Sequence, residues 1–320
     1  SHQAGRRNPE CNVCWEQEEQ GHRSLRQSID AVLPPITNNP ELLVLDYSLD
    51  HLCNLKCIMC NEQASSAILA EKKALGYPVI PIKIKKDSVR IDFLKAHIYR
   101  LSELKIYNTG EPLMSPLFAP MIDLINEHNP NLNLMVSTNG TKVEQKIVDK
   151  LKQIKNLTIK ISVDGFDTVN DFVRYPSKWK EIEAGAQLLK TIPNIKLIVH
   201  TTIQALNLYQ MDRLVNWAFM QGLDLELAPV NRAPLLDIRV IPVENREIYK
   251  DKVKAILKSK HINSANMKSL LATLKQLDQT DFCAVSHKEL QDLLTSVCTL
   301  RKINLRDYMP EEVDLLQINK

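Results

Sequence analysis

The sequence has little glycine, few aromatic residues and almost no net charge. Eight of its 320 residues are glycine and 5% are aromatic, and 41 Lys and Arg residues nearly balance 38 Asp and Glu residues. A net charge of +3 is small for a protein that binds nucleic acid or membranes mainly through positive charge. No run of 18 apolar residues is present, which excludes a transmembrane helix, and no charged-then-apolar start predicts a signal peptide.

The seven cysteines are informative because their number is odd and five of them form two tight groups. These groups are Cys11/Cys14 and Cys53/Cys57/Cys60. A secreted disulfide scaffold is usually shorter, richer in cysteine and even-numbered. Closely spaced thiols favour metal or cluster ligands in a reducing compartment, so we expect a cytoplasmic protein without disulfides.

Short apolar segments alternate with segments of helical periodicity between residues 41 and 235. Strands are expected at 42–48, 104–107, 132–136, 157–163, 195–203 and 223–227, and helices at 64–75, 118–126, 143–154, 179–189 and 211–220. This alternation predicts an α/β fold with a parallel sheet. Six units are fewer than the eight of a closed barrel, so we expect an open, partial (β/α)6 TIM-like barrel.

Two further regions flank this predicted barrel. Residues 1–40 are polar and form an N-terminal cysteine-containing segment. Residues 236–320 are expected to be a helical appendage, with helices at 244–258, 264–277 and 287–300 and a mostly polar tail from 304. The predicted domains are therefore 1–40, 41–235 and 236–320.

The sharpest motif is Cys53-Asn54-Leu55-Lys56-Cys57-Ile58-Met59-Cys60, which directly follows the first expected strand. Three thiolates at this spacing can hold one iron–sulfur cube. Three protein ligands leave one iron of a four-iron cluster open to a small molecule. Zinc is the alternative, but structural zinc sites usually have four protein ligands in C-x2-C pairs.

From residue 41 to 235 the chain resembles the radical SAM superfamily, because landmarks of that family occur in the same order. The turn Asn108-Thr109-Gly110-Glu111-Pro112 resembles the family's GGE motif, with Thr109 in place of the first glycine. Ser137-Thr138-Asn139-Gly140 resembles its TNG turn. Ser162-Val163-Asp164-Gly165 ends the fourth strand as in many members, and Leu225–Pro229 matches the region of the family's last strand.

The resemblance implies a [4Fe–4S] cluster on Cys53, Cys57 and Cys60, whose free iron binds the amino and carboxylate groups of S-adenosylmethionine (SAM). It implies an enzyme in which one-electron reduction cleaves SAM to methionine and a 5′-deoxyadenosyl radical, which removes a hydrogen atom from the substrate. The protein's part is binding, orientation and exclusion of water. An electron donor such as flavodoxin or ferredoxin is implied as a partner.

The same resemblance implies a set of SAM-binding residues. The set is Met59, Thr109, Gly110, Glu111, Asn139, Ser162, Arg174 and Ala228. Met59 is expected near the adenine, and Gly110 and Glu111 at the methionyl amine, because a carbonyl and a carboxylate suit an ammonium group. Ser162 is expected at the ribose or the carboxylate, and Arg174 is expected to pair bidentately with the carboxylate.

Several of these residues also have a simpler interpretation. Met59 is compatible with ordinary core packing, and Gly110 with a tight turn that needs glycine for its backbone alone. Asn139-Gly140 is a common turn dipeptide, and most arginines such as Arg174 lie on the surface.

The pair Cys11/Cys14 lies in a segment that resembles the region just upstream of the core in twitch/SPASM-like radical SAM proteins. In those proteins further cysteines come earlier, so we expect an auxiliary iron–sulfur cluster that is incomplete here, or a lost start. The chain begins Ser1-His2 rather than with Met, which indicates the remnant of a tag or a missing upstream segment. The alternatives for this pair are a zinc half-site and a redox pair.

The two remaining cysteines, Cys283 and Cys298, are expected to be buried as small hydrophobic residues. The resemblance implies a peptide or small-molecule substrate, with a nucleotide or nucleic acid as the alternative. The basic run Lys83–Lys86 comes with no base-stacking aromatic residues, so it gives no support to nucleic-acid binding. A non-catalytic iron–sulfur or zinc protein is the alternative function, against which the complete cysteine motif argues.

Overall fold

The computed structural model of the chain describes residues 11–21, 23–31, 43–80, 86–107, 109–230, 233–259, 262–279 and 283–318. Some sequence predictions therefore lie outside the described residues. These are the positions 1–10 and 32–40 of the N-terminal segment, the run Lys83–Lys85 and Asn108 of the turn before Thr109.

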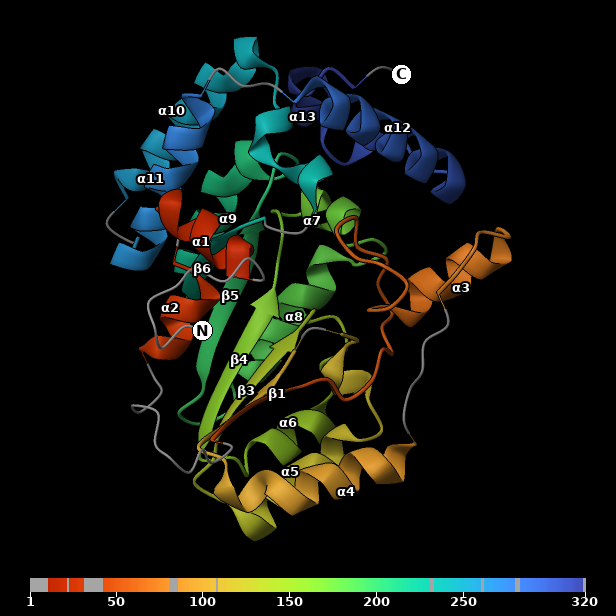
Figure 1. Cartoon of the computed structure of the whole chain (residues 1–320), viewed down its shortest axis with the longest axis vertical. Coiled ribbons are helices and arrows are strands. Elements are labelled where there is room, and N and C mark those ends of the chain that lie inside the picture. The colour runs from red at the N-terminus through yellow and green to blue at the C-terminus, as the bar shows by residue number, and fades with distance from the viewer. Residues whose placement is uncertain are drawn as a thin grey trace. The chain divides into compact units, whose positions relative to one another are not determined.

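The chain forms two compact units. Residues 41–201 and 217–224 make one of them, here called the sheet unit. Residues 1–40, 202–216 and 225–320 make the other, here called the helical unit. Figure 1 labels the elements of both.

The strands form a six-stranded sheet whose order follows the chain, which confirms the predicted α/β partial barrel. They are β1 (Val44–Tyr47), β2 (Glu103–Ile106), β3 (Asn133–Thr138), β4 (Asn156–Ser162), β5 (Lys196–Ile203) and β6 (Asp224–Pro229). Neighbours from β1 to β5 pair in parallel. Because the register places Thr138 beside Ile161 and Ser162 beside His200, the carboxyl ends of β3 and β4 lie at one edge of the sheet.

The sheet unit also contains six helices and two short 3-10 turns in the described residues. They are α3 (Ser66–Ala74), α4 (Asp87–His97), α5 (Phe118–His128), α6 (Gln145–Leu151), α7 (Thr168–Val173) and α8 (Trp179–Leu189), with the 3-10 turns η3 (Ile98–Arg100) and η4 (Pro112–Met114). Helix α4 contacts α5, α5 contacts α6, and α6 contacts α8, so these helices follow one another across the sheet (Figure 1).

The core of the sheet unit consists of strand side chains packed against these helices. Ile106, Val136 and Ile159 are completely buried on the strands, and Phe118 and Ile122 are completely buried on α5. Burial of apolar area at about 25 cal/mol per Å² is the main favourable term in such packing. The alternation of buried and partly exposed residues along β2, β3 and β4 explains why the apolar periodicity predicted these strands.

The helical unit contains the N-terminal and C-terminal helices. Its helices are α1 (Asn12–Glu19), α2 (Leu25–Asp30), α9 (Met211–Met220, to residue 216), α10 (Arg246–Leu257), α11 (Ser264–Leu277), α12 (Ala284–Arg301) and α13 (Pro310–Leu315). Its 3-10 turns are η5 (Leu208–Gln210), η6 (Pro234–Leu236), η7 (Ile238–Val240), η8 (Val243–Asn245) and η9 (Leu305–Asp307). Arg246 is buried and donates to the carbonyl oxygens of Ile241 and Arg239, each at 3.0 Å, which joins α10 to η7.

The prediction of a mostly polar tail after residue 304 is wrong. Leu305, Met309, Val313 and Leu316 are all buried, and α13 forms within this segment. The apolar residues are few but recur every three or four positions, which is helical spacing. Helices α1, α2, α4 and α7 were also not predicted. Helix α1 buries none of its side chains, so it has no apolar stripe to recognise.

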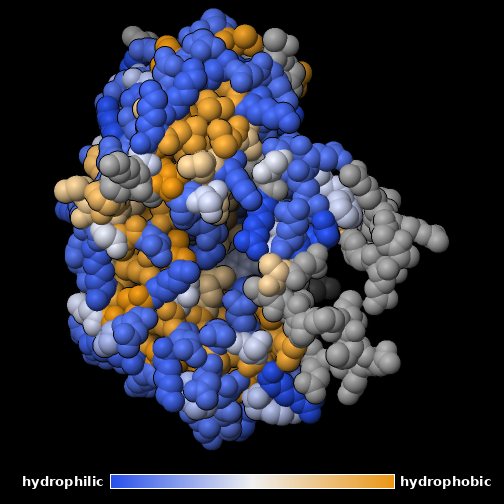
Figure 2. Space-filling model, turned by 90° about the vertical axis from the view of Figure 1, so that its left-hand side faces the viewer, coloured by the Kyte–Doolittle hydropathy of each residue, from blue (hydrophilic) through white to orange (hydrophobic). Residues whose placement is uncertain are grey.

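On the face drawn in Figure 2, hydrophobic residues are exposed in patches between hydrophilic ones. Within the described residues, every helix is too short or too polar to cross a membrane.

A carboxyl group is buried in the helical unit. Glu312 of α13 is 0% exposed, and burial raises its pKa to about 7, with a further contribution from the negative charge of Glu311. Tyr249 of α10 is also completely buried, and burial, together with the charge of Glu312, raises its pKa. The ionised form of Glu312 is therefore unfavourable in the folded chain.

Glu312→Gln is expected to stabilise the protein above pH 7 by about 3 kcal/mol and to lose this advantage near pH 5. The folded-state pKa exceeds the unfolded one, so the stability from the neutral carboxyl is complete at low pH and is lost as the pH rises through about 7. Urea unfolding of both proteins across this range measures the difference. Glu289→Gln, at an exposed glutamate of α12, is the control, and a stabilisation by Glu312→Gln that does not vary with pH would contradict the prediction.

Candidate functional site

The three motif cysteines lie in one loop between β1 and α3. Residues 48–65 form this loop, here called the cysteine loop. Ser65, the N-cap of α3, donates its hydroxyl to the carbonyl oxygen of Leu55 at 2.6 Å, and Leu55 is 1% exposed. The hydroxyl of Ser66 accepts from the backbone N–H of Cys53 at 3.1 Å and lies 3.2 Å from its carbonyl oxygen. The start of α3 therefore holds the cysteine loop in place.

Cys53, Cys57 and Cys60 all carry free thiols that are partly buried. Burial raises the pKa of each thiol, that of Cys57 to about 12. The backbone N–H of Cys60 donates to the carbonyl oxygen of Cys57 at 3.0 Å, which forms a tight turn between them. Metal binding needs thiolates, and burying a negatively charged thiolate costs free energy. The bound group itself must therefore supply the positive charge that offsets this cost.

The thiols fit an iron–sulfur cluster better than a single metal ion. In the part of the chain that the structure describes, no three His, Cys, Asp or Glu side chains converge closely enough to hold one ion. In a four-iron cluster each thiolate binds a different iron, so the sulfur atoms stand further apart than the ligands of one ion. Three free thiols in one loop suit a cluster that keeps one iron open.

At Gly110 the backbone after β2 meets the cysteine loop. Gly110 has a φ of +72°, and a Cβ atom there would lie 2.7 Å from the carbonyl oxygen of Asp50 and 3.0 Å from that of Leu52. Its N–H donates to the carbonyl oxygen of Ala64 at 2.9 Å. Thr109 donates its hydroxyl to the carbonyl oxygen of Asp50 at 2.8 Å. Both the conformation and the available space therefore require glycine at this position.

Glu111 is a buried carboxylate that joins the ends of β2 and β3. It is 2% exposed. Its Oε1 atom accepts from the Thr138 hydroxyl at 2.6 Å and from the Leu113 N–H at 3.2 Å, and its Oε2 atom accepts from the Asn139 N–H at 2.6 Å. Burial raises its pKa although these hydrogen bonds act in the opposite direction. One acceptor position on Oε2 remains for a further donor such as the predicted methionyl amine.

Asn139 connects the turn after β3 to the cysteine loop. Its Nδ2 atom donates to Asn54 Oδ1 at 3.0 Å, and Asn54 Nδ2 donates to the Thr141 hydroxyl at 2.9 Å. Asn139 Oδ1 accepts from the backbone N–H of Thr141 at 2.9 Å. Asn139 therefore positions the residue next to Cys53, which is more than a turn dipeptide does by itself.

The same turn packs tightly against helix α8. A Cβ atom at Gly185 would lie 2.2 Å from the carbonyl oxygen of Gly140, and one at Gly140 would lie 2.9 Å from the side chain of Ile161. The absence of side chains at both glycines lets the helix approach the turn that carries Asn139.

Arg174 lies between a buried carboxylate and a motif cysteine. Its Nη2 atom is 2.6 Å from Asp164 Oδ2, and its Nη1 atom is 4.0 Å from Cys57 Sγ. The backbone brings them together, because the N–H groups of Lys56 and Ile58 donate to the carbonyl oxygens of residues 175 and 173 at 2.5 and 2.9 Å. Arg174 is therefore not a surface arginine.

The other predicted SAM-binding residues are placed less tightly. Met59 is partly exposed in the cysteine loop and does not belong to the buried core. Ser162 ends β4 and is half-buried, and no hydrogen bond of its hydroxyl is found within the described residues. Ala228 is a half-buried residue of β6 in the helical unit. Their roles toward SAM remain predictions.

Cys11 and Cys14 lie at the start of α1. Cys11 is the N-cap of that helix, Cys14 lies one turn further on, and both are partly buried and form no disulfide. Residues three apart share one face of a helix, so both thiols can serve one ligand. The auxiliary cluster predicted for this pair remains a prediction.

The prediction that Cys283 and Cys298 are buried is wrong. Cys283 is exposed just before α12, and its sulfur is 3.1 Å from the hydroxyl of Ser286, which lowers the pKa of the thiol. Cys298 is partly buried on α12. A cysteine at a helix start is solvated more readily than one on an inward helical face, and sequence alone did not distinguish these positions.

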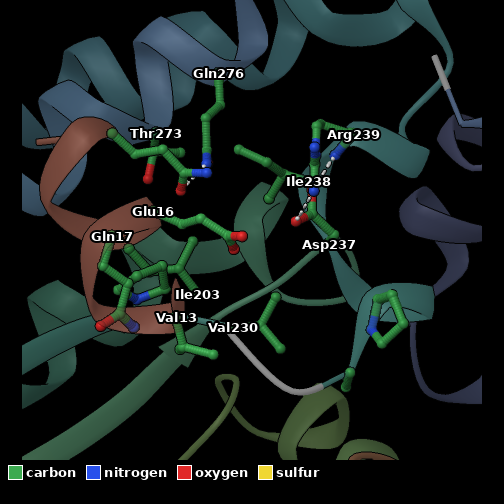
Figure 3. Close-up of a pocket in the computed structure, with 14 residues that line it drawn as sticks. Val13, Glu16, Gln17, Ile203, Val230, Asp237, Ile238, Arg239, Thr273 and Gln276 are labelled. Atoms are coloured by element: carbon green, nitrogen blue, oxygen red, sulfur yellow. Dashed lines mark hydrogen bonds and ion pairs between the residues drawn. The ribbon is translucent and has the colours of Figure 1, made fainter. Parts of the chain in front are cut away.

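A pocket lies within the helical unit where β5 and β6 end. Its volume is about 150 Å³, and its walls include Val13 of α1, Ile203 of β5 and Val230 after β6. Figure 3 shows the carboxyl groups of Glu16 and Asp237 on facing sides of this pocket. Arg239 also lines the pocket and forms an ion pair with Asp237 at 2.9 Å, so the space offers apolar contact together with charges of both signs.

Sequence reasoning missed three residues that position the site: Asp50, Asn54 and Asp164. Asp164 was visible in the Ser162–Gly165 motif, and Asn54 lies between two motif cysteines, but neither position indicated its partner. Asp50 accepts from the Ser115 hydroxyl at 2.5 Å as well as from the groups after β2. These contacts join distant segments, so no local pattern reveals them.

Comparison with known proteins assigns this arrangement to a class. The sequence model of the radical SAM superfamily matches residues 47–217, just over half of the chain. The chain therefore belongs to the radical SAM superfamily. This class of enzymes uses a [4Fe–4S] cluster and SAM, which agrees with the thiols of the cysteine loop.

Two curated relatives and one solved structure show what the chain is similar to. An uncharacterised protein of Methanocaldococcus jannaschii is 28% identical over 53% of this chain and 56% of its own length. The AdoMet-dependent heme synthase of Methanosarcina barkeri is 23% identical over 56% of this chain and 47% of its own length. The chain thus spans about half the length of these curated relatives. The solved structure of native anSMEcpe with bound AdoMet shares the fold, with a TM-score of 0.51 and 17% identity over 67% of this chain and 60% of that one.

Gly110→Ala is expected to weaken SAM binding at least tenfold and to destabilise the protein by more than the 1–2 kcal/mol or so that a left-handed alanine costs. The added methyl group must displace the cysteine loop, because it would meet two carbonyl oxygens. Gly76→Ala is the matched control, since Gly76 has a φ of +73° but no atom within 4 Å of its added Cβ. Equilibrium dialysis with SAM and urea unfolding measure the two effects, and equal losses in both variants would show that crowding at residue 110 is unimportant.

Proposed function

We propose that this chain binds a [4Fe–4S] cluster through Cys53, Cys57 and Cys60 and uses it with SAM to remove a hydrogen atom from a peptide or a small molecule. When bound, the cluster supplies the electron that cleaves SAM reductively and so generates the 5′-deoxyadenosyl radical. The observation that carries this proposal is the attachment of the cysteine loop to the strand-end motifs. Gly110, Asn139 and Arg174 each contact that loop or its thiols.

The residues of the chain bind and orient the two cofactors. The carboxylate of Glu111 and the backbone at Gly110 offer acceptors to the methionyl amine, while the guanidinium of Arg174 offers donors to the methionyl carboxylate. Met59 offers an apolar contact to the adenine, and Ser162 a hydroxyl to the ribose or the carboxylate. The buried setting of Glu111 fixes its geometry before SAM binds, which reduces the reorganisation that binding requires.

A peptide or a small molecule is the substrate class of this proposal. The name of one relative, AdoMet-dependent heme synthase, supports a small molecule as the alternative to a peptide. Short peptides and haem precursors should therefore be compared for their ability to stimulate the formation of 5′-deoxyadenosine.

A low-potential one-electron donor such as flavodoxin or ferredoxin is part of the proposal, because the reductive cleavage of SAM consumes one electron. We also propose a cytoplasmic setting, because none of the seven cysteines, all of which the structure describes, forms a disulfide, and a reducing compartment keeps cysteines in this state.

The function is tested by anaerobic reconstitution with iron and sulfide. After addition of dithionite and SAM, 5′-deoxyadenosine is expected to form and can be measured by chromatography. Reconstituted protein that holds the cluster and binds SAM, yet forms no 5′-deoxyadenosine, would contradict the catalytic proposal and favour a binding function.

Replacement of Cys53, Cys57 or Cys60 by Ala is expected to abolish the SAM-binding cluster and the formation of 5′-deoxyadenosine, because each thiolate is a ligand. Cys283→Ala serves as the control, since this exposed thiol lies in the other unit and should leave the iron content unchanged. If any of the three loop variants retains full iron and activity, the assigned ligand set is wrong.

Iron analysis tests the role of Cys11 and Cys14. A chain with one four-iron cluster contains about four irons, and one with an additional four-iron cluster contains about eight. If the pair holds an auxiliary cluster, the double variant Cys11→Ala/Cys14→Ala should lose about four irons and keep the SAM-binding cluster. About four irons in the parent protein would exclude the auxiliary four-iron cluster.

A further inference from the structure

The ion pair between Asp164 and Arg174 lies beside the sulfur atom of Cys57. Asp164 is 0% exposed just after β4, and the side chain of Arg174 is 14% exposed. One guanidinium nitrogen, Nη2, lies 2.6 Å from the carboxylate, and a different nitrogen, Nη1, lies 4.0 Å from Cys57 Sγ. The sulfur contact is at the long limit for a hydrogen bond, so its effect is mainly electrostatic.

Backbone groups fix the positions of Cys57, Arg174 and Asp164 relative to one another. The backbone N–H groups on either side of Cys57 donate to the carbonyl oxygens on either side of Arg174. Asn170 accepts the backbone N–H of Asp164 at 2.9 Å through its Oδ1 atom, and Arg174 N–H donates to Asn170 O at 2.8 Å. Cys57, Arg174 and Asp164 are thus held by backbone contacts that do not depend on their own side chains.

A buried ion pair is a costly way to stabilise a fold, because desolvation of both ions offsets most of their attraction. Its retention beside a cluster ligand has a direct electrostatic consequence. One-electron reduction adds a negative charge to an iron–sulfur cluster, and hydrogen bonds and positive charge at the ligand sulfurs stabilise the reduced state. A guanidinium remains charged at any relevant pH.

We propose that Arg174 is a positioning residue for Cys57, held in place by Asp164, and that it raises the reduction potential of the cluster. This inference rests on the proposed function, because it requires the cluster on Cys57. The electron comes from the external one-electron donor, and no bond or proton changes at Arg174. The role acts before SAM binds and is therefore separate from the predicted pairing of Arg174 with the methionyl carboxylate.

Both roles are compatible on one side chain. The buried Nε atom of Arg174 has no hydrogen-bond partner within the described residues. The Nη1 and Nη2 atoms are directed to Cys57 and Asp164, so Nε remains for a ligand carboxylate and would give one hydrogen bond in place of the predicted bidentate pair. A lysine at this position has one nitrogen and cannot lie at both Asp164 and Cys57.

The test is the midpoint potential of the cluster in the absence of SAM. Reconstituted wild-type protein and the Arg174→Gln variant are titrated anaerobically with dithionite while the reduced cluster is followed by electron paramagnetic resonance. We expect the variant to be harder to reduce by at least tenfold in the equilibrium constant, which is about 59 mV for a one-electron couple.

Lys56→Gln is the matched control. It removes the same charge from the residue adjacent to Cys57, but its ammonium group is 2.9 Å from Glu71 on α3. We expect the potential of this variant to shift by less than a third of the shift in Arg174→Gln. Equal shifts in both variants would show that only the net charge of the loop matters and would overturn the proposal.

Arg174→Lys covers the case in which Arg174→Gln does not assemble a cluster. It retains the positive charge but cannot contact both Asp164 and Cys57, so the reduction potential of its cluster is expected to fall below that of the wild type. A wild-type potential in every Arg174 variant that holds the cluster would overturn the proposal. If neither variant holds the cluster while both remain folded by circular dichroism and Lys56→Gln holds it, the positioning of Cys57 by Arg174 is supported.

The outcomes also separate this inference from the proposed function. Failure of the wild-type protein to form 5′-deoxyadenosine would count against the function whatever its potential is. A wild type that cleaves SAM, together with an Arg174→Gln variant of unchanged potential and weakened SAM binding, would leave the function intact and assign Arg174 to the carboxylate alone.

Discussion

The close approach of the backbone at Gly110 to the carbonyl oxygens of Asp50 and Leu52 is the constraint on which the site depends. Two loops from neighbouring strands can meet at this distance only when one contributes no side chain. In this arrangement the N–H of Gly110 donates to the carbonyl oxygen of Ala64, and the hydroxyl of Thr109 donates to the carbonyl oxygen of Asp50. The cysteine loop, which has no regular structure of its own, is therefore shaped by its neighbour in the sheet.

Buried polar side chains extend this constraint across the sheet edge. Glu111 joins the end of β2 to that of β3, Asn139 joins β3 to the cysteine loop, and Arg174 joins that loop to the segment after β4. Each group is buried or partly buried and has partners, as the cost of an unpaired polar group in a low-dielectric setting requires. Under the proposed function, this arrangement would offer acceptors to the methionyl amine and donors to the methionyl carboxylate.

The alternation of strands and helices was predictable because the sheet buries every second residue of its strands. The gathering of the motifs at one edge of the sheet was predictable for the same strands, because parallel strands bring their carboxyl ends to one edge. Helix α1 was not predictable, because no residue of it is buried. The partners of Asp164 and Asn54 were not predictable either, because each contact joins segments far apart in the chain, and only the fold brings them together. The exposure of Cys283 depends in the same way on where a helix begins.

The paired glycines of α8 and of the turn after β3 link an outer helix to the chemistry of the site. Gly185 leaves room for the carbonyl oxygen of Gly140, the residue that follows Asn139 in the turn. In genetic terms, substitutions at position 185 should therefore have the same effect as substitutions in the active site. A substitution there moves the turn that contains Asn139, whose side chain donates to Asn54, so inactivating changes on α8 and in the cysteine loop would share one phenotype.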